Sequence, residues 1–255
     1  MPLPKVIRAT LAVLLVAAVA APAATGDEAL VEVNNLVLRA DGGFKPQKLP
    51  RRQYAPIDFS GHIDISAKGG GAPSPLRQAL IDFDRDGRLS VAGLPSCAPE
   101  QVAQASSEEA RQICAGAIVG TGHIGAAISL PGGAVVGRVP LTIFNGPRLA
   151  TGPSVIFHAR LTFPAIETHA IVVPIERLTG GFRYRARIEM PPLAGGLGAL
   201  THIDVKIGRR YRAGGQRRSY VSARCSDNVL QTHGTFTFAD GTGISGLVEK
   251  FCQDK

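Results

Sequence analysis

The chain has no Cys-x-x-Cys pair, no Gly-x-Ser-x-Gly motif, no tryptophan and few aromatic residues. Without closely spaced cysteines, a zinc ribbon or a thioredoxin-like site has no support. The missing serine motif removes the local signature of a serine hydrolase, although a triad can be assembled from distant residues without any motif. After residue 24, no apolar run approaches the roughly 20 residues that a membrane-spanning helix needs. We therefore expect no transmembrane anchor once the N-terminus has been processed.

The N-terminus has the parts of a cleavable export signal. Lys5 and Arg8 precede an apolar run over residues 11–20, and small residues follow at 21–24. The run is shorter than the roughly 20 residues that cross a bilayer, so a retained anchor is the weaker interpretation. We predict a signal peptide over residues 1–24 and a secreted protein, either extracellular or held at the cell envelope.

Four cysteines remain after signal removal, and they predict two disulfides. An oxidising exterior favours disulfides over thiol catalysis or a zinc site. Three pairings are possible in principle. We choose Cys97 with Cys114 and Cys225 with Cys252, because each pair is close in sequence and flanks one compact unit.

Glycine and proline are abundant, with 30 and 18 residues, whereas aromatic residues make up only 5%. Many short strands joined by tight turns give this profile, and strand-like runs recur about every ten residues from residue 117 onward. We predict an all-β protein, a two-layer antiparallel β-sandwich of jelly-roll or related type. Residues 25–255 form its single domain, since all-β folds often reach about 200 to 250 residues as one unit. An irregular segment is expected at about 40–56.

One short helix is expected, starting at Ser106. The sequence Ser106-Ser107-Glu108-Glu109 fits a capping box, in which the serine hydroxyl and the glutamate carboxylate satisfy free backbone N–H groups. The helix should end near Cys114. Farther toward the N-terminus, an Asp-Gly turn at 86–87 between residues 80–83 and 88–91 predicts a hairpin.

The same turn is a candidate calcium loop. Asp82, Asp84 and Asp86 stand at loop positions 1, 3 and 5, and Gly87 stands at position 6. Position 12, where a bidentate glutamate belongs, is Gly93, and no helix follows. We therefore expect a plain hairpin and no cofactor, with calcium as the alternative.

Two short strings each place an imidazole and a carboxylate on one face of a strand: His62-Ile63-Asp64 and His202-Ile203-Asp204. A third histidine would complete the facial triad of an iron oxygenase, and the candidates are His123, His158 and His233. Polar residues at every second position are also typical of a solvated strand face. We favour the solvated face over a metal site.

Gly120, Gly122 and Gly125 match the G-x-G-x-x-G pattern after an apolar segment. A dinucleotide-binding unit would continue with a helix and an acidic residue about 20 positions on. Instead, Pro131 and two glycines interrupt the segment, and no acid occurs before Glu167. We expect these glycines to serve a tight turn or a strand bulge.

Arginines cluster in two segments. Residues 182–188 alternate between arginine and apolar or aromatic side chains, which predicts a strand with one face toward solvent and one toward the core. The pattern of residues 209–218 predicts a hairpin with a cationic tip. If these strands are neighbours, the guanidiniums form one patch that can bind phosphates or carboxylates bidentately. The alternative is a solvated face kept soluble by arginine. The set comprises Arg183, Arg185, Arg187, Arg209, Arg210, Arg212, Arg217 and Arg218.

Five parts of the chain point to a known family: residues 93–97, 114–120, 144–146 and 236–241, and Cys225. They resemble an uncharacterised family of exported actinobacterial proteins. The resemblance covers most of the mature chain and implies export and a β-rich architecture. It implies no catalytic residues, because the family has no established activity.

Removal of Lys5 and Arg8 lowers the formal net charge from +8 to +6. This excess favours anionic partners such as cell-wall polymers or acidic glycans, whereas specific nucleic acid is a poor candidate outside the cell. We expect a non-catalytic secreted binding or surface-associated protein that contacts an anionic polymer through its arginine-rich strands. The alternatives are an exported hydrolase or carbohydrate-active enzyme using Asp82, Asp84 or His123, and a purely structural exoprotein.

Overall fold

The computed structural model describes residues 24–254. The signal-peptide prediction falls almost wholly on residues 1–23, which lie outside the described part of the chain. The described chain is dominated by strands, which confirms the all-β class. None of its helices is long and apolar enough to cross a membrane.

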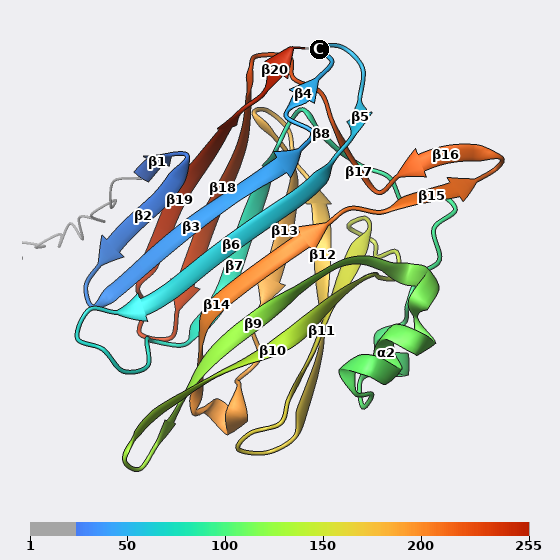
Figure 1. Cartoon of the computed structure of the whole chain (residues 1–255). Coiled ribbons are helices and arrows are strands. Elements are labelled where there is room, and N and C mark those ends of the chain that lie inside the picture. The colour runs from blue at the N-terminus through green and yellow to red at the C-terminus, as the bar shows by residue number, and fades with distance from the viewer. Residues whose placement is uncertain (1–23, 255) are drawn as a thin grey trace, which may run out of the picture.

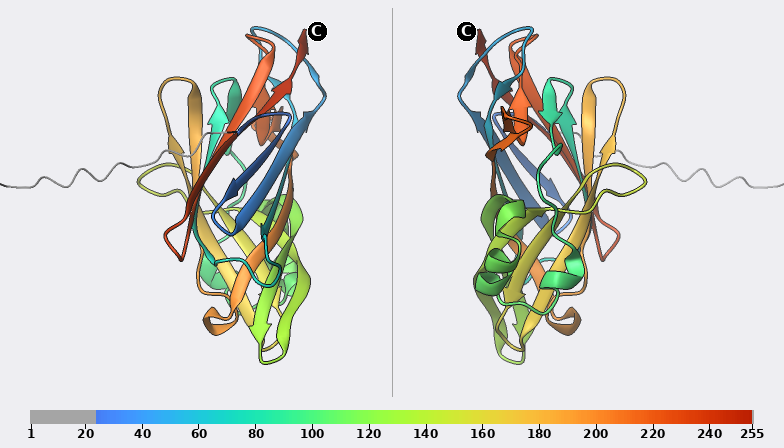
Figure 2. Two further views of the ribbon diagram at one scale, coloured as in Figure 1. Left: turned by 90° about the vertical axis from the view of Figure 1, so that its left-hand side faces the viewer. Right: turned by 90° about the vertical axis from the view of Figure 1, so that its right-hand side faces the viewer.

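A single sheet of thirteen strands folds over into two layers (Figure 1, Figure 2). The front layer comprises β2 (Glu28–Val33), β3 (Leu36–Lys45), β6 (Asp58–Ala67), β14 (Gly198–Ile207), β9 (Ile118–Leu130) and β10 (Gly133–Asn145). The back layer comprises β1 (Ala24–Gly26), β19 (Gly243–Phe251), β18 (Val229–Phe238), β7 (Leu76–Asp84), β13 (Phe182–Glu189) and β12 (Glu167–Arg177). β11 (Ser154–Leu161) connects the layers between β10 and β12.

Consecutive strands from β9 to β13 lie side by side in the sheet, so much of the fold is an antiparallel meander. β1 runs parallel to β19 and also contacts β2, so the two ends of the sheet meet. Three small sheets complete the fold. They are the hairpin β15 (Arg210–Ala213) and β16 (Gln216–Ser219); the triplet β5 (Ala55–Pro56), β17 (Val221–Ala223) and β8 (Gly87–Leu89); and the pair β20 (Gln253–Asp254) and β4 (Lys48–Leu49).

Two local predictions need correction. β7 and β8 flank the expected turn, but they do not form a hairpin, because β13 and β18 occupy both edges of β7 and β8 pairs with β17. The segment at 40–56 is also more regular than predicted. β3 continues to Lys45 because it stays paired with β6, and only the following residues form an irregular connection.

The predicted helix is α2 (Ser107–Ile113), and its capping box forms. The Ser106 hydroxyl accepts a hydrogen bond from the backbone N–H of Glu109 (3.2 Å), and the Glu109 carboxylate accepts one from that of Ser106 (2.8 Å). A four-residue helix, α1 (Pro99–Val102), and the 3-10 turns η1 (Ala115–Ala117) and η2 (Ala194–Gly196) were not predicted.

Both disulfides pair as predicted, Cys97 with Cys114 and Cys225 with Cys252. The first lies in a small apolar cluster that includes Val102 of α1 and Phe144 and Ile156 of the sheet. Through this cluster, the helices pack against the outer face of β10 and β11. The helices do not cover the outer face of β6, β14 and β9 (Figure 1).

Candidate functional site

The eight arginines of the predicted anionic site fall into two separate groups. Three lie on the outward face of β13, whose Tyr184 and Ala186 are buried, so the predicted alternation is confirmed. The others belong to the hairpin β15–β16 and the residue before it, and this hairpin projects from the side of the molecule (Figure 1). β13 lies between β7 and β12, and β15 pairs only with β16. The strands are therefore not neighbours, and one continuous patch does not form.

Protein carboxylates hold several of these guanidiniums. Arg185 donates two hydrogen bonds to Asp82 (2.6 and 2.7 Å), and Arg187 donates two to Glu176 (2.9 and 3.3 Å). These bonds raise the pKa of both arginines, against the smaller effect of burial.

Three more arginines of the set also have local partners. Arg209 donates to the carbonyl of Ile118, Arg210 to the carboxylate of Asp58, and the Arg183 guanidinium lies over the ring of Tyr54. Arg218 is half-buried, and its Nε makes no hydrogen bond within the described chain.

Arg212 and Arg217 differ from the rest of the set. They are direct cross-strand partners in the hairpin, and both are exposed. Neither side chain forms an ion pair or a hydrogen bond with any residue that the structure describes. Like charges directly opposite each other destabilise a strand pair, so these two arginines do not stabilise the hairpin.

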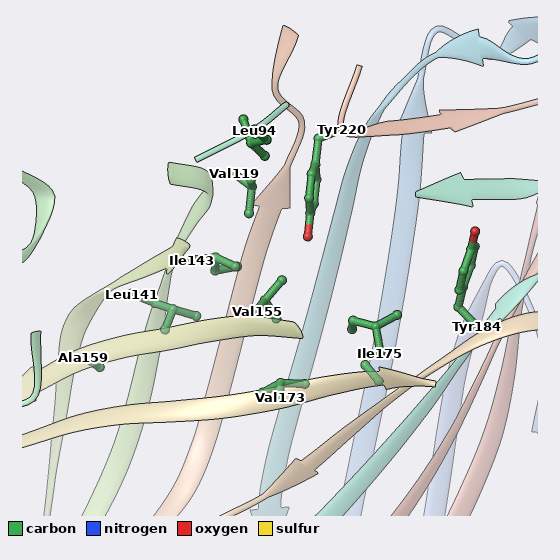
Figure 3. Packing of buried hydrophobic residues seen from close by; sticks show 11 residues of the cluster. Leu94, Val119, Leu141, Ile143, Val155, Ala159, Val173, Ile175, Tyr184 and Tyr220 are labelled. Atoms are coloured by element: carbon green, nitrogen blue, oxygen red, sulfur yellow. The ribbon is translucent and has the colours of Figure 1, made fainter. Parts of the chain in front are cut away.

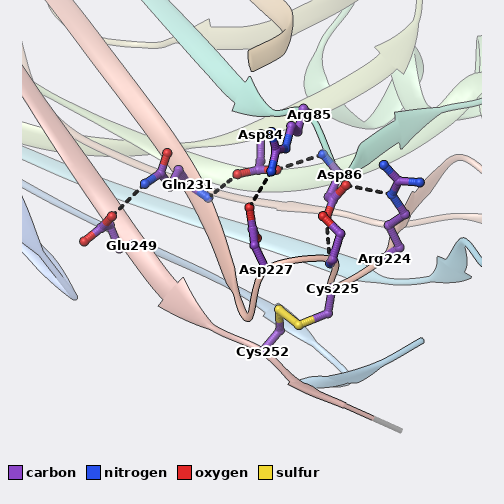
Figure 4. A network of polar contacts seen from close by, with 10 residues as sticks. Asp84, Arg85, Asp86, Arg224, Cys225, Asp227, Gln231, Glu249 and Cys252 are labelled. Carbon is purple, nitrogen blue, oxygen red and sulfur yellow. Dashed lines mark hydrogen bonds and ion pairs between the residues drawn. A yellow bond between two sulfur atoms is a disulfide. The ribbon is translucent and has the colours of Figure 1, made fainter. Parts of the chain in front are cut away.

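The aspartates of the candidate calcium loop have protein donors as partners, and Figure 4 shows this for Asp84 and Asp86. Asp84 accepts hydrogen bonds from the backbone N–H groups of Asp86 (2.8 Å) and Gln231 (2.9 Å). Asp86 accepts from Arg224 (2.7 Å) and from the backbone of Ser226 (2.7 Å). Together with the Asp82–Arg185 pair, these contacts occupy the oxygens that a calcium ion would require.

Burial acts differently on the two aspartates of this network. Burial raises the pKa of Asp84, and its two backbone hydrogen bonds do not offset the effect. Burial also raises the pKa of Asp86, but there the hydrogen bonds from Ser226 and Arg224 outweigh it and the net shift is downward.

The structure brings the two His-x-Asp strings together. β6 and β14 are antiparallel neighbours, with His202 opposite Asp64 and Asp204 opposite His62. His123 on β9 lies opposite Asp204. The sequence placed each pair on one strand face, but only the register of β6, β14 and β9 joins them into one row.

The row forms a chain of close contacts. The Asp64 carboxylate accepts hydrogen bonds from His62 Nε2 and His202 Nδ1, both at 2.7 Å. The Asp204 carboxylate lies 3.2 Å from His202 Nε2 and 3.3 Å from His123 Nδ1. Burial raises the pKa of Asp64, but the two histidine hydrogen bonds outweigh it and hold the pKa below its ordinary value.

The other two histidines considered for a triad lie elsewhere. His158 is buried beneath the helices, where its Nε2 lies 3.1 Å from the carbonyl of Val102, and His233 stands beside Asp82 on the back layer. The third group in the cluster of His62 and His202 is the carboxylate of Asp64, not a histidine.

Glycines on β9 allow this close approach. A side chain at Gly122 would collide with the backbone of Asp204, and a Cβ at Gly125 would lie 3.0 Å from the Cβ of His202. The G-x-G-x-x-G pattern therefore lies within one continuous strand and serves close strand packing. These glycines were expected to serve a tight turn or a strand bulge. A bulge does lie next to Gly120, and no tight turn occurs within this strand.

A cavity of about 260 Å³ lies between the two layers, and sequence reasoning did not find it. Its wall is predominantly apolar and comes from both layers, for example from Phe59, Ile63 and Val205 in front and Phe83, Tyr184 and Ile188 behind. Phe59, Phe83 and Val205 line this interior and yet are only half-buried. A smaller cavity of about 70 Å³ shares Ile63 and Ile188 with it.

Small residues leave this space open. Ala40, Gly61, Ala186 and Gly234 line the cavity from four strands and fill little of it. Small residues at inward strand positions are the sequence signal that could have indicated a cavity. They indicate one only when it is known which strands face each other across the interior.

Tyr220 places a hydroxyl in this apolar space. The residue is 2% exposed, and Figure 3 shows its ring reaching between the layers with the hydroxyl directed toward Val155. That hydroxyl makes no hydrogen bond to any described residue, whereas the Tyr184 hydroxyl accepts one from the backbone of Leu89 (3.4 Å). Burial strongly raises the pKa of Tyr220, so the hydroxyl is neutral and can donate.

The residues suggested for a hydrolase do not converge. Asp82 and Asp84 belong to β7 of the back layer, and His123 belongs to β9 of the front layer. No family model matches the chain, and no curated protein or solved structure matches it either. The resemblance to exported actinobacterial proteins stays a prediction.

Proposed function

We propose that the protein binds a small apolar molecule between the two layers of its sandwich. The observation that carries this proposal is the apolar cavity of about 260 Å³, which approaches the lower end, about 300 Å³, of small-molecule sites. We further infer that the protein acts outside the cell, because two disulfides persist best in an oxidising compartment.

The energetic cost of an empty cavity supports a ligand. At roughly 24 cal/mol per Å³, a closed void of this size would cost about 6 kcal/mol, and this value is an upper limit because some lining residues are only half-buried. Water stabilises an apolar cavity poorly because it finds few hydrogen-bond partners there. An apolar ligand would recover both the lost contacts and the hydrophobic contribution.

The ligand that fits best has an apolar body and one hydrogen-bonding group. The body would pack against the aromatic and aliphatic wall, and the polar group would pair with the free hydroxyl of Tyr220. A hydrogen bond from this hydroxyl to a ligand hydroxyl or carbonyl would contribute about 1 kcal/mol and would orient the ligand.

A fluorescence titration with N-phenyl-1-naphthylamine tests the proposal. We expect saturable enhancement with the wild-type protein and displacement by 1-decanol. Val205→Phe fills the cavity and should abolish the enhancement without loss of thermal stability. Val135→Phe places the same substitution at a position that is 45% exposed on β10, and it should bind as the wild type does.

Two outcomes contradict the proposal: no saturable binding by the wild type, or undiminished binding by Val205→Phe. Tyr220→Phe separates the contribution of the hydroxyl from that of the cavity. This variant should weaken displacement by 1-decanol by about tenfold, the equivalent of one hydrogen bond of about 1.4 kcal/mol, and leave displacement by decane unchanged.

A second candidate function is contact with an anionic polymer through the tip of the hairpin β15–β16. The unpaired cross-strand arginines Arg212 and Arg217 support it. The double substitution of both to Gln should lower the salt concentration that elutes the protein from heparin more than the substitution of Arg111 and Arg148 to Gln. The second pair removes the same charge from exposed positions elsewhere. Elution of the two variants at the same salt concentration would rule out specific anion binding by the tip of the hairpin.

A further inference from the structure

We propose that His62, Asp64 and His202 bind a divalent transition-metal ion on the outer face of the front layer. Each residue offers one ligand atom, and the three atoms lie within 4.8 Å of one another. Two imidazoles and one carboxylate suit late first-row ions such as Zn²⁺ or Fe²⁺, because imidazole is a preferred ligand of both. The ligand residues alternate along their strands with the cavity-lining Ile63 and Ile203, and His62 also borders the cavity. The metal proposal does not rest on the proposed ligand binding.

The hydrogen bonds of the cluster already hold the ligands in place. The Asp64 carboxylate bridges His62 Nε2 and His202 Nδ1 at 2.7 Å each, and the two rings pack edge to face with centroids 4.7 Å apart. An ion between these atoms would replace the shared protons and keep the same three partners.

A supporting carboxylate stands behind one ligand. The second ring nitrogen of His202, Nε2, lies 3.2 Å from Asp204. Histidines that bind metal usually donate their other N–H to a carboxylate, which fixes the tautomer and the ring orientation. With an ion bound, His202 would donate its Nε2–H to Asp204, which leaves Nδ1 without a proton and directed at the ion. Asp204 is itself held by His123 at 3.3 Å.

Burial and access also suit an exchangeable ion. The His202 side chain is only 7% exposed and lies opposite Gly125, where a Cβ would come within 3.0 Å of its own Cβ. His62 and Asp64 remain 39% and 45% exposed, so an ion can enter from solvent between them. Three protein ligands leave at least one coordination position for water or another small ligand.

Isothermal calorimetry with Zn²⁺ on tag-free protein, first stripped with a chelator, tests the site. We expect one ion per chain. His62→Gln and Asp64→Asn should each weaken binding by at least about tenfold, and Asp204→Asn should weaken it by about 10–100-fold, as for other supporting carboxylates. His233→Gln removes a partly exposed histidine that also stands beside an aspartate and should not change the affinity.

A second measurement uses only the wild-type protein, so it does not require that the substituted variants fold. In the wild-type protein, Zn²⁺ should shift the imidazole NMR resonances of His62 and His202 and leave those of His233 in place. The proposal is overturned if millimolar Zn²⁺ gives no heat, if His62→Gln and Asp64→Asn bind like the wild type, or if the resonances of His62 and His202 do not move.

Discussion

At the scale of single residues, partners decide what a charged side chain can do. The arginines of β13 look like a cationic stripe in the sequence, yet Arg185 and Arg187 are held by Asp82 and Glu176 in the fold. Arg212 and Arg217 belong to a similar run of arginines and remain unpaired within the described chain. Sequence spacing shows which side chains share a strand face, but it does not show which acid lies on the next strand.

This difference predicts that substitution of the two kinds of arginine has unequal effects on stability. Asp82 is 5% exposed, so Arg185→Gln leaves a buried carboxylate without its two charged hydrogen bonds. We expect the free energy of unfolding to fall by about 2 kcal/mol, within the range of about 1.5–3 for hydrogen bonds to charged groups. Arg212→Gln should change it by less than about 0.5 kcal/mol, as is usual for exposed positions. Equal urea midpoints for the two variants would contradict the assigned pairing.

At the scale of the strands, register is what assembles the histidine row. His62, Asp64, His202 and Asp204 could be placed on outward faces from the period of two alone. A shift of either strand by one residue would turn one string to the interior. The glycines of β9 take part in setting this register, because Gly122 brings the strand against the backbone of Asp204 more closely than any side chain permits.

Gly122→Ala should therefore destabilise the protein far more than alanine at a matched position. Its Cβ would collide with the Asp204 carbonyl group, and overpacking of this kind costs about 1–3 kcal/mol. Gly137 on the neighbouring strand β10 has no atom within 4 Å of a Cβ, so Gly137→Ala should raise stability by about 0.5 kcal/mol. Thermal unfolding of both variants measures the contrast. Two similar melting temperatures would argue against the close contact of β9 and β14.

At the scale of the whole molecule, the space between the layers sets the properties of the fold. Inward side chains of the two layers meet in part, as where the rings of Phe59 and Phe83 pack edge to face, and several side chains stay half-buried around the cavity that remains. The disulfide Cys225–Cys252 joins the segment after β17 to the end of β19, beside the polar network around Asp86 (Figure 4). Covalent and polar contacts therefore supplement a core that is incompletely packed.

An incompletely packed core predicts sensitivity to pressure. The volume change of unfolding scales with the internal voids that unfolding removes, and it ranges from about −20 to −100 mL/mol. We expect a value toward the large end of this range for the ligand-free protein. Val205→Phe should reduce its magnitude, and Val135→Phe should not. High-pressure fluorescence gives these values, and an identical volume change for the two variants would show that the cavity does not persist in solution.

The sequence by itself determined the all-β class, the capped helix at Ser106 and the pairing of four cysteines, because these depend on local periodicity, on contacts three residues apart and on short chain loops. Only the tertiary structure decided that β7 and β8 do not pair, that the arginines separate, that two His-x-Asp strings become neighbours and that a cavity remains between the layers. The physical reason is that these features depend on which distant strands hydrogen-bond to each other and in which register. A pattern along one strand does not specify its neighbour.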